Sequence, residues 1–311
     1  MNTAVNDFLS NVIFGEPQLF NNLAVLPMHY EDNKLLNYII LDKAMKDNVI
    51  EIKEVSSSGS VPELVVANKC FKRILLIDGE ELQGAKQNRI INTTILLRKN
   101  SETKIPVSCV ERGRWNFNSP NFKSSGNVAN REMRVKKTMS VTQSLRTSKN
   151  FRSDQGEVWK EVDKFMEMNE VNSPTSAMSD VFEKNNYSFD EVVKNFKPVP
   201  NQRGFVFFMN GKLMGFDYFS KKSAFKDLYH KILKGYVSDS FSKVKQLSEV
   251  DYLTTAWDFL NSIRNCKEEE FKSVGMGNDF RYQSDNVMAS SLVVSRFDEK
   301  VIHFSGHNIA V

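Results

Sequence analysis

Two apolar runs that end in dense polar clusters constrain this chain more than any other feature. Residues 72–115 read KRILLIDGEELQGAKQNRIINTTILLRKN, then a short polar connection, then TKIPVSCVERGRW. Short continuous apolar runs of this kind are typical of strands that are buried on both faces. Ordinary buried strands do not need so many costly polar groups beside them, so the two clusters predict a functional site.

The remaining pattern predicts an α+β fold with a β-rich N-terminal part, built on a mixed or antiparallel sheet, and with helices and further hairpins in the C-terminal half. Apolar patterning predicts early strands at 23–28, 38–41, 49–55, 64–67, 73–77, 90–97 and 105–110, with a helical turn at 42–47. Caps and amphipathic spacing predict helices that begin at Asp154, Ser173-Pro174 and Ser188, and two more at 223–236 and 251–266. Asn210-Gly211 predicts a hairpin turn, and strands at 289–295 and 300–305 would flank the turn Phe297-Asp298-Glu299.

The length of 311 residues suits one large domain or two ordinary ones. We expect a single compact α+β domain over 1–311. Its natural subdivision would be a β-rich part at 1–115, a basic loop segment at 116–153 and a helical and hairpin part at 154–311. The middle segment is rich in Asn, Ser, Lys and Arg and longer than a normal connection, which predicts a functional or disordered loop.

The net charge of +4 conceals a strong asymmetry. Residues 112–152 hold ten basic side chains and a single acid, Glu132, so the rest of the chain is acidic. A basic segment on an acidic body indicates a phosphate-bearing ligand or a nucleic acid. A solvated loop is the equally weighted alternative.

Several classes of protein and site are disfavoured. No apolar run reaches 18 residues and the N-terminus lacks a signal-peptide pattern, so we expect a cytoplasmic protein without membrane contact. The three cysteines do not form a disulfide framework, and the four histidines have no metal-binding spacing, so no metal ligand is assigned. The common glycine-rich dinucleotide and P-loop patterns are absent, and the cofactor stays unassigned.

The candidate catalytic residues are three carboxylates and one thiol. A carboxylate whose pKa is raised by burial can act as a general acid or base, and the sequence offers Glu80, Glu81 and Glu111. Cys109 could be a nucleophile, although it follows an apolar run as a packed core thiol would.

The candidate ligand-binding residues surround these groups. Arg89 and Arg114 can hold phosphate or carboxylate by a planar two-point fork, which Lys86 cannot reproduce. Gln87 and Asn88 can read amide or hydroxyl groups, and Trp115 can stack on a base. The alternative is an internal Glu–Arg network that joins strand ends.

These motifs resemble a known family, the domain named for its association with ADP-ribosylglycohydrolase and rhodanese-phosphatase proteins. The resemblance is carried by DGE at 78–80, GAKQNR at 84–89, PVSCVE at 106–111 and GRW at 113–115, with Gln155 and the Val158-Trp159 pair as a later helix signature. Arg112 departs from the family pattern, in which a small or neutral residue is expected, and it adds positive charge beside the site. The resemblance implies a neighbourhood with NAD and ADP-ribose processing enzymes and only a predicted enzymatic role.

Three functional hypotheses follow. The first is a cytoplasmic enzyme or sensor that binds a nucleotide-like, phosphate-bearing metabolite related to ADP-ribose or NAD. The second is a nucleic-acid-binding protein that uses the basic segment at 112–152, with few aromatic residues available for stacking. The third is a non-catalytic partner or scaffold protein whose charged clusters form an internal brace. The sequence does not identify the reaction, the ligand or the oligomeric state.

Overall fold

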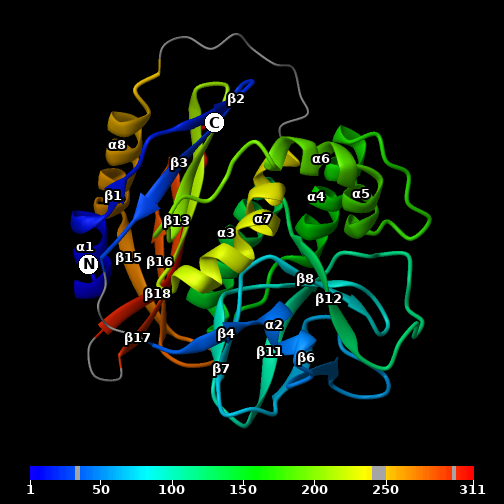
Figure 1. Cartoon of the computed structure of the whole chain (residues 1–311). Coiled ribbons are helices and arrows are strands. Elements are labelled where there is room, and N and C mark those ends of the chain that lie inside the picture. The colour runs from blue at the N-terminus through cyan, green and yellow to red at the C-terminus, as the bar shows by residue number, and fades with distance from the viewer. Residues whose placement is uncertain (32–35, 240–249, 296–298) are drawn as a thin grey trace.

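The computed structural model describes residues 1–31, 36–239, 250–295 and 299–311. A long antiparallel sheet stands between two groups of helices, and a smaller curled β structure packs beneath the second group (Figure 1). The predicted α+β class, with sheets early and helices and hairpins later, is confirmed. No helix in these ranges is long and apolar enough to cross a bilayer.

The large sheet is assembled from both ends of the chain. Strands close to the N-terminus pair with strands from the C-terminal half, and every pairing in this sheet is antiparallel. The order is β1 (Ile13–Phe14), β3 (Leu23–His29), β13 (Gly204–Met209), β14 (Lys212–Phe219), β18 (Glu299–Asn308), β17 (Val287–Ser295), β16 (Asn278–Gln283) and β15 (Lys267–Lys272), with β2 (Gln18–Phe20) also on β3.

The curled β structure, which we call the half-barrel, comprises residues 38–128. Two sheets enclose one apolar core, to which α2 (Leu41–Lys46) also contributes. The six-stranded sheet runs β12 (Phe122–Val128), β8 (Glu80–Gly84), β9 (Arg89–Ile91), β11 (Ser101–Cys109), β6 (Glu63–Asn68) and β5 (Ile50–Glu54). The three-stranded sheet runs β10 (Ile95–Leu97), β7 (Arg73–Leu76) and β4 (Tyr38–Ile40), and β4 pairs with β7 in parallel.

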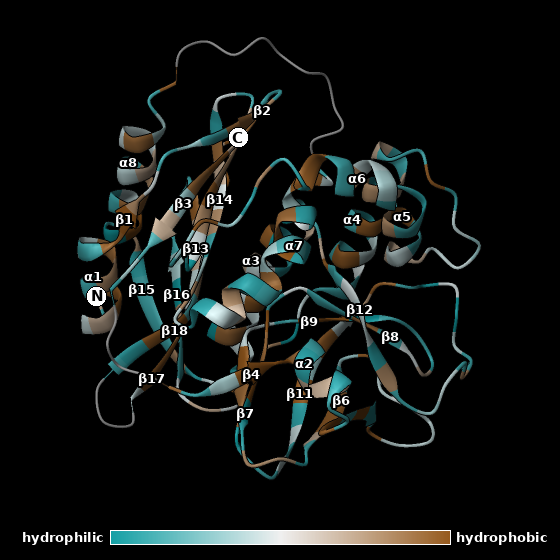
Figure 2. Cartoon of the chain, in the orientation of Figure 1, coloured by the Kyte–Doolittle hydropathy of each residue, from teal (hydrophilic) through white to brown (hydrophobic). Residues whose placement is uncertain are grey.

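Helices cover both faces of the large sheet. On one face, α1 (Thr3–Asn11) and α8 (Tyr252–Arg264) bury Phe8 and Leu260 in a common core with the strands. On the other face, a second core joins the sheet to a larger group of helices, of which those at 155–168, 178–184 and 222–237 also contact the half-barrel. The whole group is α3 (Arg131–Ser148), α4 (Gln155–Met168), α5 (Met178–Lys184), α6 (Asn186–Val193) and α7 (Lys222–Val237). The edge strand β15, which reads KEEEFK, is hydrophilic along its length (Figure 2).

Local signals predicted most of these elements correctly. Asp154 caps α4 by accepting from two backbone N–H groups, and the Asn210-Gly211 turn, with positive φ at both residues, joins β13 to β14. The helix predicted at Ser173-Pro174 is wrong, because helix α5 starts only at Met178. Ser188 lies inside α6 rather than at its start. The turn predicted at 297–299 falls largely outside the described residues.

The basic loop predicted at 116–153 is wrong for most of its length. This segment contains β12 and the 18-residue helix α3. The buried face of α3 carries Arg131, Arg134 and Lys137 among its apolar residues, so the apolar periodicity that identifies a helix is nearly lost. The sequence also gave no prediction of α1, β8, β15 or β16.

Candidate functional site

The two predicted polar clusters meet at one end of the half-barrel. In the antiparallel ladder, Arg89 of β9 pairs with Leu82 of β8 on one side and with Cys109 of β11 on the other. The β8–β9 turn and the residues after β11 are therefore neighbours. We call this end the mouth, formed by residues 84–89 and 109–119.

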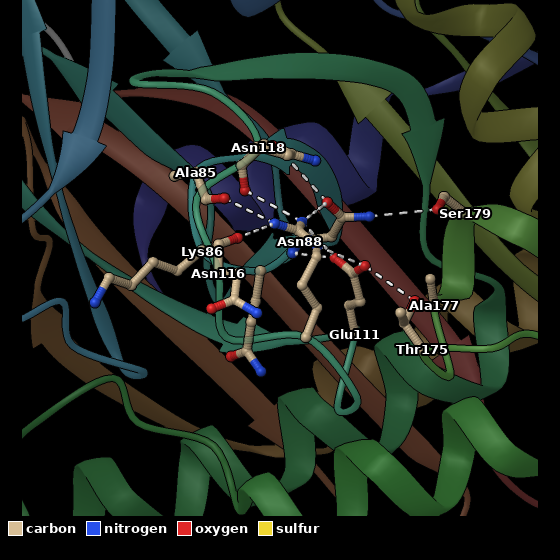
Figure 3. Close-up of polar contacts among 12 residues, drawn as sticks. Ala85, Lys86, Asn88, Glu111, Asn116, Asn118, Thr175, Ala177 and Ser179 are labelled. Atoms are coloured by element: carbon tan, nitrogen blue, oxygen red, sulfur yellow. Dashed lines mark hydrogen bonds and ion pairs between the residues drawn. The ribbon is translucent and has the colours of Figure 1, made fainter.

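Glu111 and Arg114 form a tightly connected ion pair at the mouth (Figure 3 shows Glu111 among its partners). Arg114 Nε donates to Glu111 Oε1 at 2.8 Å, and Arg114 Nη2 donates to Glu111 Oε2 at 2.6 Å. The same carboxylate accepts from the Asn88 backbone N–H at 3.0 Å and from the Thr175 hydroxyl at 3.0 Å. Both oxygens of Glu111 are thus fully occupied by protein groups.

The remaining polar atoms of Arg114 and Asn88 are occupied as well. Arg114 Nη1 donates to the carbonyls of Ala85 and Asn116 at 2.7 and 3.0 Å. Asn88 Oδ1 accepts from Arg114 Nη2 at 3.1 Å, and Asn88 Nδ2 donates to Ser179 Oγ at 3.3 Å (Figure 3). These contacts correspond to the internal Glu–Arg network that the sequence left open as an alternative, and they brace the β8–β9 turn against the strand ends.

Arg89, unlike Arg114, has few hydrogen-bond partners. Its side chain is completely buried, yet only Nη1 has hydrogen-bond partners, Gln87 Oε1 at 3.0 Å and the Asn88 carbonyl at 3.3 Å. Arg89 Nε and Nη2 are buried without a partner. Desolvation by burial lowers the pKa of Arg89, which the nearby Cys109 and Glu54 partly oppose.

Aromatic side chains lie over Arg89. The Trp115 ring centroid lies 5.7 Å from Arg89 Cζ, and Trp115 keeps 43% of its surface exposed. Lys86 Nζ lies 5.1 Å from the ring centroids of both Trp115 and Phe117 and donates to the Ser58 carbonyl at 2.8 Å. The side chains that separate Arg89 from solvent are therefore half-exposed rings and a lysine.

Cys109 shares the inner face of the half-barrel with Arg89, because directly paired residues of an antiparallel ladder point to the same side. The thiol is fully buried, and its sulfur accepts from the Glu111 backbone N–H at 3.4 Å. Gln155, part of the later helix signature, makes two hydrogen bonds of 2.8 Å with the Cys109 backbone. Helix α4 therefore fixes the end of β11 to which Cys109 belongs.

Glu81 lies on the opposite side of the sheet from Arg89. It pairs with Ile90, whereas the next residue, Leu82, pairs with Arg89, and successive residues of a strand face opposite ways. Ile90 belongs to the apolar core shared with the helices, not to the core of the half-barrel. The ladder thus separates Glu81 from the Arg89 side chain.

The Glu81 carboxyl group is fully buried, and neither oxygen has a hydrogen-bond partner. Burial raises its pKa to about 8, and the charges of Glu111 and Glu183 act in the same direction. Ser125 and Asn127, from the bulged part of β12, lower the pKa without making a geometrically sound hydrogen bond. The raised pKa favours the protonated form of Glu81 at neutral pH.

Glu80 belongs to a different group of ion pairs. Its carboxylate pairs with Lys231 of α7, which also bonds Asp42 of α2 at 2.8 Å, and it accepts from the Ile77 backbone N–H at 3.1 Å. Burial raises the pKa of Glu80, although Lys231 opposes that shift. Of the predicted catalytic residues, Cys109 is the one that pairs directly with Arg89 across the ladder.

A second buried polar cluster was missed by the sequence analysis. Arg134 of α3 donates to both oxygens of Asp217 at 2.9 and 2.7 Å, and Asp217 also contacts His303 Nε2 at 3.0 Å. His303 Nδ1 contacts the Thr94 hydroxyl at 2.7 Å. We call these residues, with Asp78 and its ion-pair partner Lys137, the central network.

The central network lies between the half-barrel, α3 and the large sheet. Only Asp78 lies in a motif that the sequence analysis singled out. Its other members come from segments without a common spacing, so no sequence signal could have joined them. Within the described ranges, no group of three or more His, Cys, Asp or Glu side chains is arranged to hold a metal ion.

Comparison with known proteins gives one family match. The family model described as the ARG and Rhodanese-Phosphatase-superfamily-associated Protein domain matches residues 11–307. No curated protein and no solved structure matches the chain. The matched span includes the half-barrel, its mouth and the central network.

Proposed function

Because this chain belongs to the ARG and Rhodanese-Phosphatase-superfamily-associated Protein domain family, we propose that its mouth binds a nucleotide-like, phosphate-bearing metabolite related to ADP-ribose or NAD. The observation that carries this proposal is the state of Arg89, a fully buried guanidinium with two nitrogens that have no partner. Leaving such donors unpaired costs free energy, which a ligand with suitable acceptors recovers. The planar guanidinium fork matches the oxygens of a phosphate group.

Trp115 supports the nucleotide-like part of the proposal. Its ring lies beside Arg89 and is half-exposed, so it can contact a ligand that approaches the guanidinium. Stacking of a base on an aromatic ring stabilises a complex by about 1–3 kcal/mol. Phosphate binding by Arg89 and base stacking by Trp115 then act on the two ends of one ligand.

A reaction at the mouth would draw on two further groups. Cys109 lies on the same face as Arg89, and Glu54 Oε2 is buried without a partner while its charge acts on Arg89. A thiol and a carboxylate are the usual choices for a nucleophile and a proton acceptor. A sensor would bind the ligand at the mouth without using Cys109 or Glu54 in a reaction.

The nucleic-acid-binding alternative is weakened because many basic side chains of the segment at 112–152 are buried or paired with acids. Arg131, Arg134 and Lys137 are buried, and Arg146 pairs with Glu269. Cations that are neutralised inside the protein cannot release counterions from a nucleic acid. The scaffold alternative predicts that the protein has no small-molecule ligand. Specific binding of any small molecule would therefore exclude it.

The test is binding of ADP-ribose and NAD, measured by calorimetry and by the shift in melting temperature. We expect a saturable stabilisation by at least one of them. Arg89→Lys keeps the charge but loses the fork, so it should weaken binding about tenfold or more. Arg152→Lys, at an exposed position outside the mouth, is the matched control. Unchanged affinity in Arg89→Lys, or no response to any nucleotide, would refute the proposal.

A further inference from the structure

A separate cavity of about 500 Å³ opens at the end of β11 opposite to the mouth. Arg98 and Lys99 lie in its wall, immediately before β11 begins at Ser101, whereas the mouth begins where β11 ends at Cys109. Nine extended residues span roughly 27 Å. A ligand in this cavity therefore does not touch Arg89.

The cavity is walled by cations from three distant parts of the sequence. Arg73 begins β7, Arg98 and Lys99 form the β10–β11 connection, and Lys272 ends β15 on the large sheet. No acidic side chain and no aromatic ring is among the described lining residues. Arg98, Lys99 and Lys272 are exposed and lie around one hollow, so their positive charges favour the entry of an anion.

A hydrogen-bond chain through Asn278 links Lys272 to an acidic side chain. Lys272 Nζ donates to Asn278 Oδ1 at 3.3 Å, and Asn278 Nδ2 donates to Glu270 Oε1 at 2.5 Å. Glu270 lies outside the lining. The Asn278 amide thus stands between Lys272 and that carboxylate.

The wall between the two sheets is held in place by close backbone packing. In the β15–β16 connection, the Met276 backbone N–H donates to the Leu96 carbonyl of β10 at 2.8 Å. A Cβ at Gly275 would lie 2.3 Å from that carbonyl oxygen, and one at Gly277, where φ is +92°, would lie 2.2 Å from the Val293 oxygen. Only glycine allows this approach, so the cavity is preformed rather than assembled by its ligand.

We propose that this cavity binds a compact small-molecule polyanion with two or more linked phosphate groups. Its volume lies within the range of small-molecule sites, and the three exposed cations in its wall suit several negative charges close together. Because no ring lines the cavity, recognition is of the phosphate chain and not of a base. Inorganic tripolyphosphate and the phosphate end of a nucleotide share this chemistry.

The experiment is titration calorimetry of the full chain with tripolyphosphate, ADP and sulfate at two salt concentrations. We expect tripolyphosphate to bind at least as tightly as ADP, sulfate to bind weakly, and affinity to fall with salt. Arg98→Ser with Lys99→Ser should weaken tripolyphosphate binding about tenfold or more. Both side chains are exposed, so the fold should tolerate the change.

The matched control removes two cations elsewhere. Lys160→Ser with Lys164→Ser changes the net charge equally on exposed positions of α4 and should leave the affinity unchanged. Absence of tripolyphosphate binding, or an equal loss in both double variants, would overturn the proposal.

Discussion

The mouth and the central network both bury arginine, but they treat it differently. In the central network, Arg134 places Nη1 and Nη2 on the two oxygens of Asp217. At the mouth, Arg114 is equally occupied by Glu111 and backbone carbonyls, while Arg89, one strand away, keeps two buried nitrogens without partners. Burial and charge alone therefore do not distinguish a site from a brace. The difference lies at Nη2, which has a hydrogen-bond partner in Arg134 and Arg114 and none in Arg89, although Arg134 Nε also lacks a partner.

The largest effect should come from breaking the central network. Arg134→Met leaves the Asp217 charge buried without its main partner, which should lower the free energy of unfolding by about 3–5 kcal/mol. Urea unfolding measures the change. Arg112→Met is the control on an exposed pair and should cost little or nothing. Equal effects of the two substitutions would remove the contrast between braced and surface arginines.

The next effect should come from the brace at the mouth. Arg114→Met removes several charged hydrogen bonds in a partly buried site and should cost about 2–3 kcal/mol of stability. The same urea titration applies. Thr175→Val, which removes one neutral donor to Glu111, should cost about 1 kcal/mol. A smaller loss for Arg114→Met than for Thr175→Val would show that the ion pair adds no stability.

The buried carboxyl group of Glu81 should make the free energy of unfolding depend on pH. Its pKa rises from an ordinary 4.5 to about 8 on folding, so between these values the folded state holds a proton that the unfolded chain has released. The free energy of unfolding should therefore fall as pH rises through this window, by up to about 1.4 kcal/mol per pH unit from this group. Glu81→Gln should remove that contribution. The pH dependence of urea unfolding, compared between the two proteins, provides the measurement, and parallel curves would contradict the assignment.

The smallest stability effect should belong to Arg89. Replacing a poorly paired buried cation by an apolar side chain of similar size is often neutral or stabilising, so Arg89→Met should change the free energy of unfolding by less than about 1 kcal/mol. The same variant should lose binding of the ligand at the mouth. A loss comparable to that of Arg134→Met would place Arg89 among the structural braces.

Much of the fold was predictable because its signals are local. The caps at Asp154 and the Asn210-Gly211 turn depend on residues a few positions apart, and their physics is the same in any context. Helix α3 was not predictable, because its buried face uses Arg134 and Lys137, whose acidic partners come from other elements. Burial of a charge depends on a partner that sequence spacing does not reveal.

The same reasoning explains what the motifs could tell about the site. The polar groups after β8 and β11 correctly marked the half-barrel end where Arg89, Cys109 and Trp115 gather. The sequence could not separate Glu81 from Arg89, since this depends on which residues pair across the ladder. It also could not tell that Arg114 is saturated and Arg89 is not.

The order of strands in the large sheet has a consequence for how the chain folds during synthesis. Its N-terminal strand β3 pairs with β13, and Asn22 bonds Asn210 from 188 residues further along the chain. The half-barrel, at 38–128, is enclosed in this interval and is complete before β13 is made. We therefore expect the half-barrel to form first on the ribosome, while β3 lacks its partner strand β13 until translation has passed Met209.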